Sequence, residues 1–152
     1  MNDFGAGRSR DGVILVARIL LVALFILFGW SKLVGYEGTV RHFADGGVPL
    51  PAIAGIVAVV MEFFAGAAIL LGFWTRPLAA LLALYTLATG FLGHHYWTMD
   101  GAARAAALTH FYKNVSIMGG FALLYVTGAG KYSVDARIGL GRPAAPTGDR
   151  VF

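Results

Sequence analysis

The chain has 152 residues, of which 58% are hydrophobic and 13% are charged, and its formal net charge is +4. Its mean hydropathy of +0.72 lies well above that of a soluble domain, so we expect an integral membrane protein. The chain contains no cysteine, which excludes disulfides, thiol relays, Cys-ligated iron–sulfur clusters and covalent c-type haem. We therefore expect no intrinsic cofactor, and redox chemistry would need a borrowed cofactor or a partner protein.

Four charge-poor segments are long enough to cross the roughly 30 Å apolar layer of a bilayer as helices. They are residues 13–33, 51–73, 77–95 and 110–129. We predict an all-α integral membrane protein, an antiparallel four-helix bundle that forms a single domain over residues 1–140. Residues 141–152 contain two prolines and few bulky side chains, and we predict a flexible C-terminal tail there.

Basic residues are distributed unevenly between the predicted loops. The tails and the second loop carry Arg8, Arg10, Arg76, Lys131, Arg137, Arg142 and Arg150, and the first and third loops carry Lys32, Arg41, Arg104 and Lys113. The positive-inside rule then predicts that both termini are cytoplasmic. Anionic lipid explains the basic pI of about 9.7 better than nucleic acid does, so the lipid bilayer is an expected partner and nucleic acid is not.

The first predicted span carries Arg18 and Lys32 on one helical stripe, about 21 Å apart along the axis. Each cation either faces the interior of the bundle or extends toward the membrane surface. For Lys32 alone, extension toward the surface is the simpler interpretation.

The second predicted span contains Glu62, the only acidic residue between Gly46 and Thr75. On a helical wheel the smallest residues share its face, namely Ala54, Gly55, Ala58, Ala65 and Gly66. The larger residues Ile53, Val57, Val60, Phe64 and Leu71 point away from it. Small residues allow helices to approach closely in lipid, so we expect Glu62 to point into the bundle.

Arg18 is the predicted partner of Glu62 in a buried ion pair. If Lys32 and Pro51 lie at the same outer level, Glu62 is about 16 Å deep and closer to Arg18 than to Lys32. Such a pair can fix the register of two helices without adding much stability. An ionisable group inside the membrane can also take part in function, and Glu62 is then the candidate proton relay.

The third predicted span is apolar all round over residues 78–92, whereas the fourth begins with polar residues. His110, Lys113 and Asn114 have i, i+3 and i+4 spacing, and Phe121 and Tyr125 follow on a neighbouring face. With Lys32 and His94, these residues are the candidate ligand-binding set at the outer leaflet. We expect no metal site, because the adjacent His94 and His95 point about 100° apart and no histidine pair has i, i+4 spacing.

Four sequence pieces in order resemble the DoxX family of small four-helix bacterial inner-membrane proteins. They are Arg18–Leu21 with Phe28–Leu33, Glu62 with Gly66 and Leu70–Arg76, Phe111–Asn114 with Gly119 and Gly120, and Gly128–Asp135. The resemblance covers roughly residues 13–139 and carries over Arg18, Lys32, Glu62, Lys113 and Asn114 as family-like polar positions. It also implies a structural motif after the fourth span, in which Ser133 and Asp135 could cap a short surface helix.

The resemblance implies a bacterial inner-membrane, multi-pass protein with a connection to membrane redox systems, some of them quinone-coupled. The favoured function is thus a quinone- or lipid-binding accessory subunit of such a system, with a larger membrane or redox complex as partner. A non-catalytic structural or assembly subunit is the alternative. An isomerase or a transporter ranks last, because transporters are usually built from internal repeats and this chain shows none.

Overall fold

The computed structural model describes residues 4–140, which form helices and no strand. The helices are α1 (Phe4–Val34), α2 (Tyr36–Asp45), α3 (Pro51–Val59), the π-helical segment η1 (Val60–Ala65), α4 (Gly66–Leu71), α5 (Thr75–Gly93), the 3₁₀ turn η2 (Tyr96–Thr98), α6 (Gly101–Thr127) and α7 (Val134–Arg137). The all-α prediction is confirmed for this part of the chain. The tail predicted at 141–152 lies outside the described residues.

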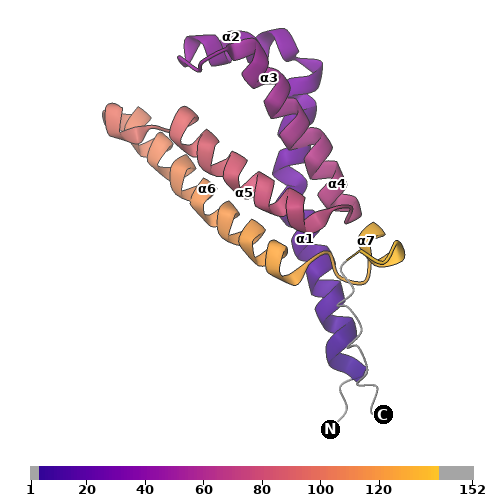
Figure 1. The fold of residues 1–152 in the computed structure, drawn as a ribbon. Coiled ribbons are helices and arrows are strands. Elements are labelled where there is room, and N and C mark those ends of the chain that lie inside the picture. The colour runs from indigo at the N-terminus through magenta and orange to yellow at the C-terminus, as the bar shows by residue number, and fades with distance from the viewer. Residues whose placement is uncertain (1–3, 141–152) are drawn as a thin grey trace, which may run out of the picture.

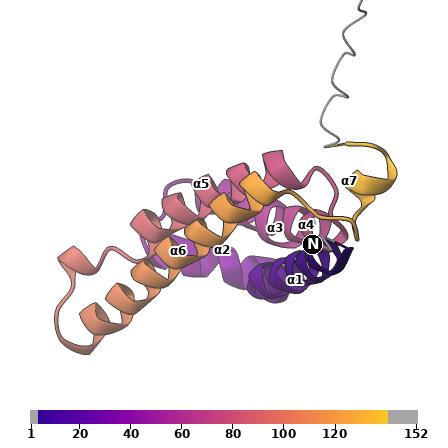
Figure 2. The same ribbon diagram turned by 90° about the horizontal axis from the view of Figure 1, so that it is seen from below.

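The long helices form two pairs that converge at one end of the molecule and diverge at the other (Figure 1). Helix α1 packs along the continuous helix made of α3, η1 and α4, and α5 packs along α6. The pairs meet near α7, while α2 and η2 lie at the ends that are far apart. Figure 2 shows the same helices from below; in the α5–α6 hairpin, α6 packs against α1, and α5 packs against η1 and α4. We call the α7 end the closed end and the α2 end the open end.

Three helical segments within residues 4–140 are long and apolar enough to cross a membrane: Ser9–Val34, Pro51–Leu71 and Thr75–Thr98. They contain most of the first three predicted spans. Most of the fourth predicted span lies in α6, which has 27 residues but carries Arg104, His110, Lys113 and Asn114 in its first half. These polar groups lower the mean hydropathy of α6, which is therefore not among the three candidate spans.

Local signals in the sequence account for both ends of the Pro51–Leu71 helix. Pro51 occupies the first turn, where its missing N–H is not needed. At the other end, Gly72 has φ of 72°, which only glycine adopts easily. The N–H groups of Gly72 and Phe73 donate to the carbonyls of Ile69 and Ala68, which closes a Schellman motif.

Glycines set how closely α1 approaches the second helix and in which register. A Cβ atom added to Gly29 would lie 2.8 Å from the Glu62 carbonyl carbon and 2.9 Å from the Glu62 Cβ, and would also overlap the Phe63 nitrogen. One helical turn further along, a Cβ atom added to Gly66 would lie 3.3 Å from the Ile26 side chain and 3.4 Å from the Phe25 Cβ, a tight contact without overlap. Gly29 therefore lies against the backbone of η1, and this contact fixes the register of the pair.

A single apolar core joins the two helical pairs. It consists of Val22, Phe25, Met61, Ala65, Ile69, Ala79, Leu82, Phe121 and Leu124. The rings of Phe25 and Phe121 meet edge to face, with centroids 5.2 Å apart. The helical-wheel prediction for the second span is confirmed: Gly55, Ala58, Ala65 and Gly66 are buried, while all five larger residues predicted to point away are exposed.

Replacing Gly29 with alanine should destabilise the protein, because the new methyl group has no space against η1. We expect a loss of about 1–3 kcal/mol, the usual cost of overpacking. Thermal unfolding in mild detergent, followed by far-UV circular dichroism, measures it. Gly119→Ala is the matched control, since a Cβ there meets nothing within 4 Å. Equal melting temperatures for the two variants would contradict the proposed helix contact.

Candidate functional site

The carboxylate of Glu62 is held by two side chains from two other helices. Lys32 Nζ on α1 donates to Oε2 at 2.6 Å, and the Tyr85 hydroxyl on α5 donates to Oε1 at 2.7 Å. The Glu62 side chain is 12% exposed and that of Lys32 is 23% exposed. Both oxygens of this buried carboxylate therefore have a donor, which removes most of the cost of placing the charge in an apolar medium. We call these three residues the Glu62 triad.

The predicted Arg18–Glu62 pair is wrong, because the register of the two helices differs from the one assumed. Gly29 lies opposite Glu62, and a Cβ on Gly55 would touch the Tyr36 ring. Pro51 is therefore level with α2 rather than with Lys32, since the chain continues for about ten residues beyond α1 before it turns back. This shift brings Lys32 to Glu62 and moves Arg18 to the level of Gly72.

Arg18 instead holds the segment that follows α6 at the closed end. It is 2% exposed, and its guanidinium donates to the carbonyls of Ala129 at 2.6 Å and Tyr132 at 2.8 Å. A Cβ on Gly72 would lie 2.6 Å from Arg18 Nη1, so glycine leaves room for the guanidinium. Arg18 is thus a structural cation that binds backbone carbonyls.

Ser133 and Asp135 complete this junction, in two different ways. Ser133 accepts a hydrogen bond from the Ala136 N–H and caps α7, as predicted. Asp135, in contrast, accepts from the backbone N–H groups of Trp74 at 2.8 Å and Thr75 at 3.0 Å, and so caps the start of α5. Trp74 has φ of 47°, a strained conformation that this carboxylate helps to hold.

The π-helical segment η1 contains Glu62 near its centre. A π-helical insertion adds one residue to a helical turn and rotates the side chains that follow, and such segments are frequent at functional sites. Residues Met61, Glu62 and Ala65 of η1 are buried, whereas Val60 and Phe64 face outward. The insertion therefore sits where the helix contacts both α1 and α5.

A cleft of about 1020 Å³ lies between the two helical pairs, and the Glu62 triad lines it. Its walls come from α1, α2, α3, η1, α5 and α6, so it occupies the region where the pairs diverge. Of the candidate ligand-binding residues, the lining includes Lys32, His94, Lys113 and Asn114. The cleft therefore brings together residues from the first, third and fourth predicted spans.

The other three candidates lie outside the lining. Phe121 is completely buried in the core, and Tyr125 is half exposed on the outer side of α6. His110 is next to the cleft: its ring stacks on His94 with centroids 5.1 Å apart, and its Nδ1 lies 3.2 Å from Lys113 Nζ. Phe121 and Tyr125 are separated from the cleft because α6 turns that face toward the core and the surface.

The sequence interpretation missed three polar residues of α5. Residues 78–92 were expected to be apolar all round, yet Tyr85, Thr86 and Thr89 line the cleft. The hydroxyls of Thr86 and Thr89 donate to backbone carbonyls of α5. The Asn114 amide donates to the Thr86 carbonyl at 3.4 Å. The i, i+1 and i+4 spacing of these residues was the signal that would have revealed a polar face.

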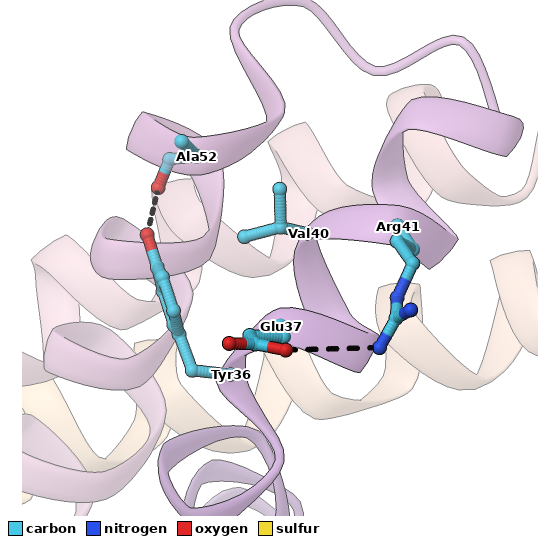
Figure 3. Close-up of a pocket in the computed structure, with 5 residues that line it drawn as sticks. All are labelled: Tyr36, Glu37, Val40, Arg41 and Ala52. Atoms are coloured by element: carbon cyan, nitrogen blue, oxygen red, sulfur yellow. Dashed lines mark hydrogen bonds and ion pairs between the residues drawn. The ribbon is translucent and has the colours of Figure 1, made fainter.

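A second, smaller hollow of about 390 Å³ lies where α2 meets the start of α3 (Figure 3). The Tyr36 hydroxyl donates to the Ala52 carbonyl at 2.7 Å, and Glu37 pairs with Arg41 at 3.9 Å on the exposed side of α2. Surface ion pairs of this kind contribute little. The Tyr36 contact fixes the position of α2, which also places Thr39, His42, Phe43 and Asp45 in the wall of the large cleft.

Comparison with known proteins gives the family. The family model for DoxX matches residues 13–95, more than half of the chain, which include most of α1, the Glu62 triad and α5. The chain belongs to the DoxX family.

Two relatives from Escherichia coli K12 are inner-membrane proteins similar to this chain over most of its length. YphA is 51% identical over 135 residues, which cover 89% of this chain and 95% of YphA. YqjF is 44% identical over 131 residues, which cover 84% of this chain and 93% of YqjF. CatD of Bacillus subtilis, named as a candidate oxidoreductase, is 33% identical over 70 residues, which cover 46% of this chain and 51% of CatD. No solved structure matches. This chain is therefore a multi-pass inner-membrane protein.

A double-mutant cycle tests the partner of Glu62. Lys32→Met and Glu62→Gln should each destabilise the protein, and their combination should fall short of the sum by about 0.5–3 kcal/mol, as expected for residues in contact. Arg18→Met combined with Glu62→Gln should be additive within about 0.5 kcal/mol. Urea or thermal unfolding in detergent measures both cycles. If only the Arg18–Glu62 cycle showed coupling, Arg18 rather than Lys32 would be the partner of Glu62.

Proposed function

We propose that this protein is a quinone- or lipid-binding accessory subunit of a membrane redox system. The main support is the position of the Glu62 triad in the wall of a cleft of about 1020 Å³, rather than in a closed helix contact. This volume suits an amphipathic ligand with a polar head and an apolar tail. Phe25, Phe28, Val57 and Ile117 supply apolar walls.

The polar groups of the cleft match the needs of a quinone headgroup. A quinone carbonyl accepts hydrogen bonds, for which Lys113 and Asn114 are available donors in the lining. A quinol hydroxyl needs an acceptor, and the Glu62 carboxylate is one. Glu62 would then accept a proton from the quinol, with Lys32 and Tyr85 holding the carboxylate in place.

The accessory role follows from the composition of the chain. It has no cysteine, and therefore no Cys-ligated iron–sulfur cluster or covalent c-type haem, so electrons would pass to a partner protein. The name of CatD describes a candidate oxidoreductase, which is in keeping with a redox setting for this family.

A non-catalytic assembly subunit is the second candidate, and one observation favours it. Both oxygens of Glu62 are bonded within the protein, so the triad could serve to join α1, η1 and α5. The cleft distinguishes the two proposals: a subunit that only joins helices has no need of a ligand in it.

We also propose four membrane spans with both termini in the cytoplasm. Helix α6 runs antiparallel to α5 along its length and would cross the membrane beside it despite its polar first half (Figure 1). The cleft faces the outer leaflet in this arrangement, and the junction around Arg18 lies near the cytoplasmic surface.

Quinone binding is tested by purifying the protein in mild detergent and quantifying ubiquinone extracted from it. Tyr85→Phe removes the hydrogen bond that positions the Glu62 carboxylate and should lower quinone affinity about tenfold. Tyr125→Phe is the control, because that side chain lies outside the cleft. Bound quinone should be unchanged in the control. Absence of quinone from every preparation, together with a stable co-purifying protein, would favour the assembly role.

Topology can be tested directly because the chain has no cysteine. Single substitutions Arg104→Cys and Lys131→Cys place one thiol near each end of α6, both at exposed positions. A membrane-impermeant maleimide applied to intact spheroplasts should label the Arg104→Cys protein and not the Lys131→Cys protein. Labelling of both from the outside would contradict a span through α6.

A further inference from the structure

Two oppositely charged side chains face the cleft without an ion-pair partner. Lys113 comes from α6 and Asp45 from the end of α2, and both line the cleft. Among the side chains that the structure describes, the ion pairs are Lys32–Glu62 and Glu37–Arg41, so neither Lys113 nor Asp45 is paired. The cation and the carboxylate lie on walls that belong to different helical pairs.

The remaining charges of the cleft cancel. Lys32 and Glu62 neutralise each other at 2.6 Å. His42, His94 and His95 also line the cleft. The cleft thus presents one free positive charge on the α6 wall and one free negative charge on the α2 wall, with no formal net charge.

The charge pattern is complementary to a zwitterionic headgroup. A phosphate diester would meet the Lys113 ammonium, with the stacked rings of His94 and His110 beside it. An ammonium that carries hydrogens would donate to Asp45. Below these groups, Leu24, Phe28, Val57 and Ile117 give an apolar wall for an acyl chain.

We infer that the cleft binds a phospholipid whose zwitterionic headgroup carries a primary ammonium, as in phosphatidylethanolamine. The inference rests on the lipid branch of the proposed function and names the class of lipid. The phosphate lies at Lys113, the ammonium lies at Asp45, and the Glu62 triad remains beneath the headgroup.

The test uses the full chain, purified in mild detergent, stripped of lipid and titrated with defined lipids by native mass spectrometry. The lipids are phosphatidylethanolamine, phosphatidylglycerol with the same acyl chains, and ubiquinone. Wild type should prefer phosphatidylethanolamine to phosphatidylglycerol. Glycerophosphoethanolamine, which has the headgroup without acyl chains, should not displace the lipid at equal concentration.

Each wall has its own variant and matched control. Lys113→Gln should weaken binding of both phospholipids about tenfold, because it removes the charge that meets the phosphate. Asp45→Asn should abolish the preference for phosphatidylethanolamine while phosphatidylglycerol binding stays the same or rises. Arg104→Gln and Glu37→Gln change exposed charges on the same two helices outside the cleft and should have no effect. Circular dichroism confirms that each variant is folded.

Three outcomes separate this inference from the function on which it rests. Ubiquinone binding without any preference between the phospholipids would overturn the inference and leave the proposed function standing. Equal lipid binding by wild type, Lys113→Gln and Asp45→Asn would show non-specific lipid around the helices and would overturn it as well. Absence of both quinone and phospholipid from the cleft would overturn both proposals.

Discussion

The contact between Gly29 and the backbone of η1 is the constraint on which the rest of the site depends. It brings α1 so close to the second helix that a side chain larger than hydrogen has no room. Three residues further along α1, Lys32 then reaches the Glu62 carboxylate. Since Tyr85 must approach the same carboxylate from α5, one backbone contact sets the geometry of three helices.

The two ends of the molecule are stabilised by different means, and this difference makes the cleft possible. At the closed end, the Arg18 guanidinium and the Asp135 carboxylate bind backbone groups of the segments that connect the helices. Charged groups form strong hydrogen bonds to carbonyls and N–H groups in apolar surroundings. The helical pairs can therefore separate at the open end, because the closed end and the core around Phe121 hold them together (Figure 1).

Much of the fold was predictable from the sequence, because membrane helices and their faces follow from hydropathy and a fixed helical period. The direction of Glu62 into the protein was predicted from the small residues on its face. Its partner was not, since that depends on the vertical register of two helices, and α2 shifted the register by about two turns. Tyr85 was overlooked because an apolar average over residues 78–92 conceals three polar side chains on one face. Phe121 illustrates a further limit: a residue on the inner face of a helix can enter either a core or a cavity, and only the packing of all helices decides which.

The arrangement of Glu62 also bears on whether a structural role and a site role can coexist. An ion pair that only joined helices would need no cavity beside it, although its desolvation must still be offset by hydrogen bonds. Here the Lys32 side chain remains 23% exposed and all three members of the triad line the cleft. The bonds from Lys32 and Tyr85 compensate the buried charge well enough for the fold, yet leave the carboxylate beside a space that a ligand can enter. A proton or a hydrogen bond from that ligand would alter the interaction that joins α1, η1 and α5. A ligand in the cleft would therefore change the contact between the two helical pairs.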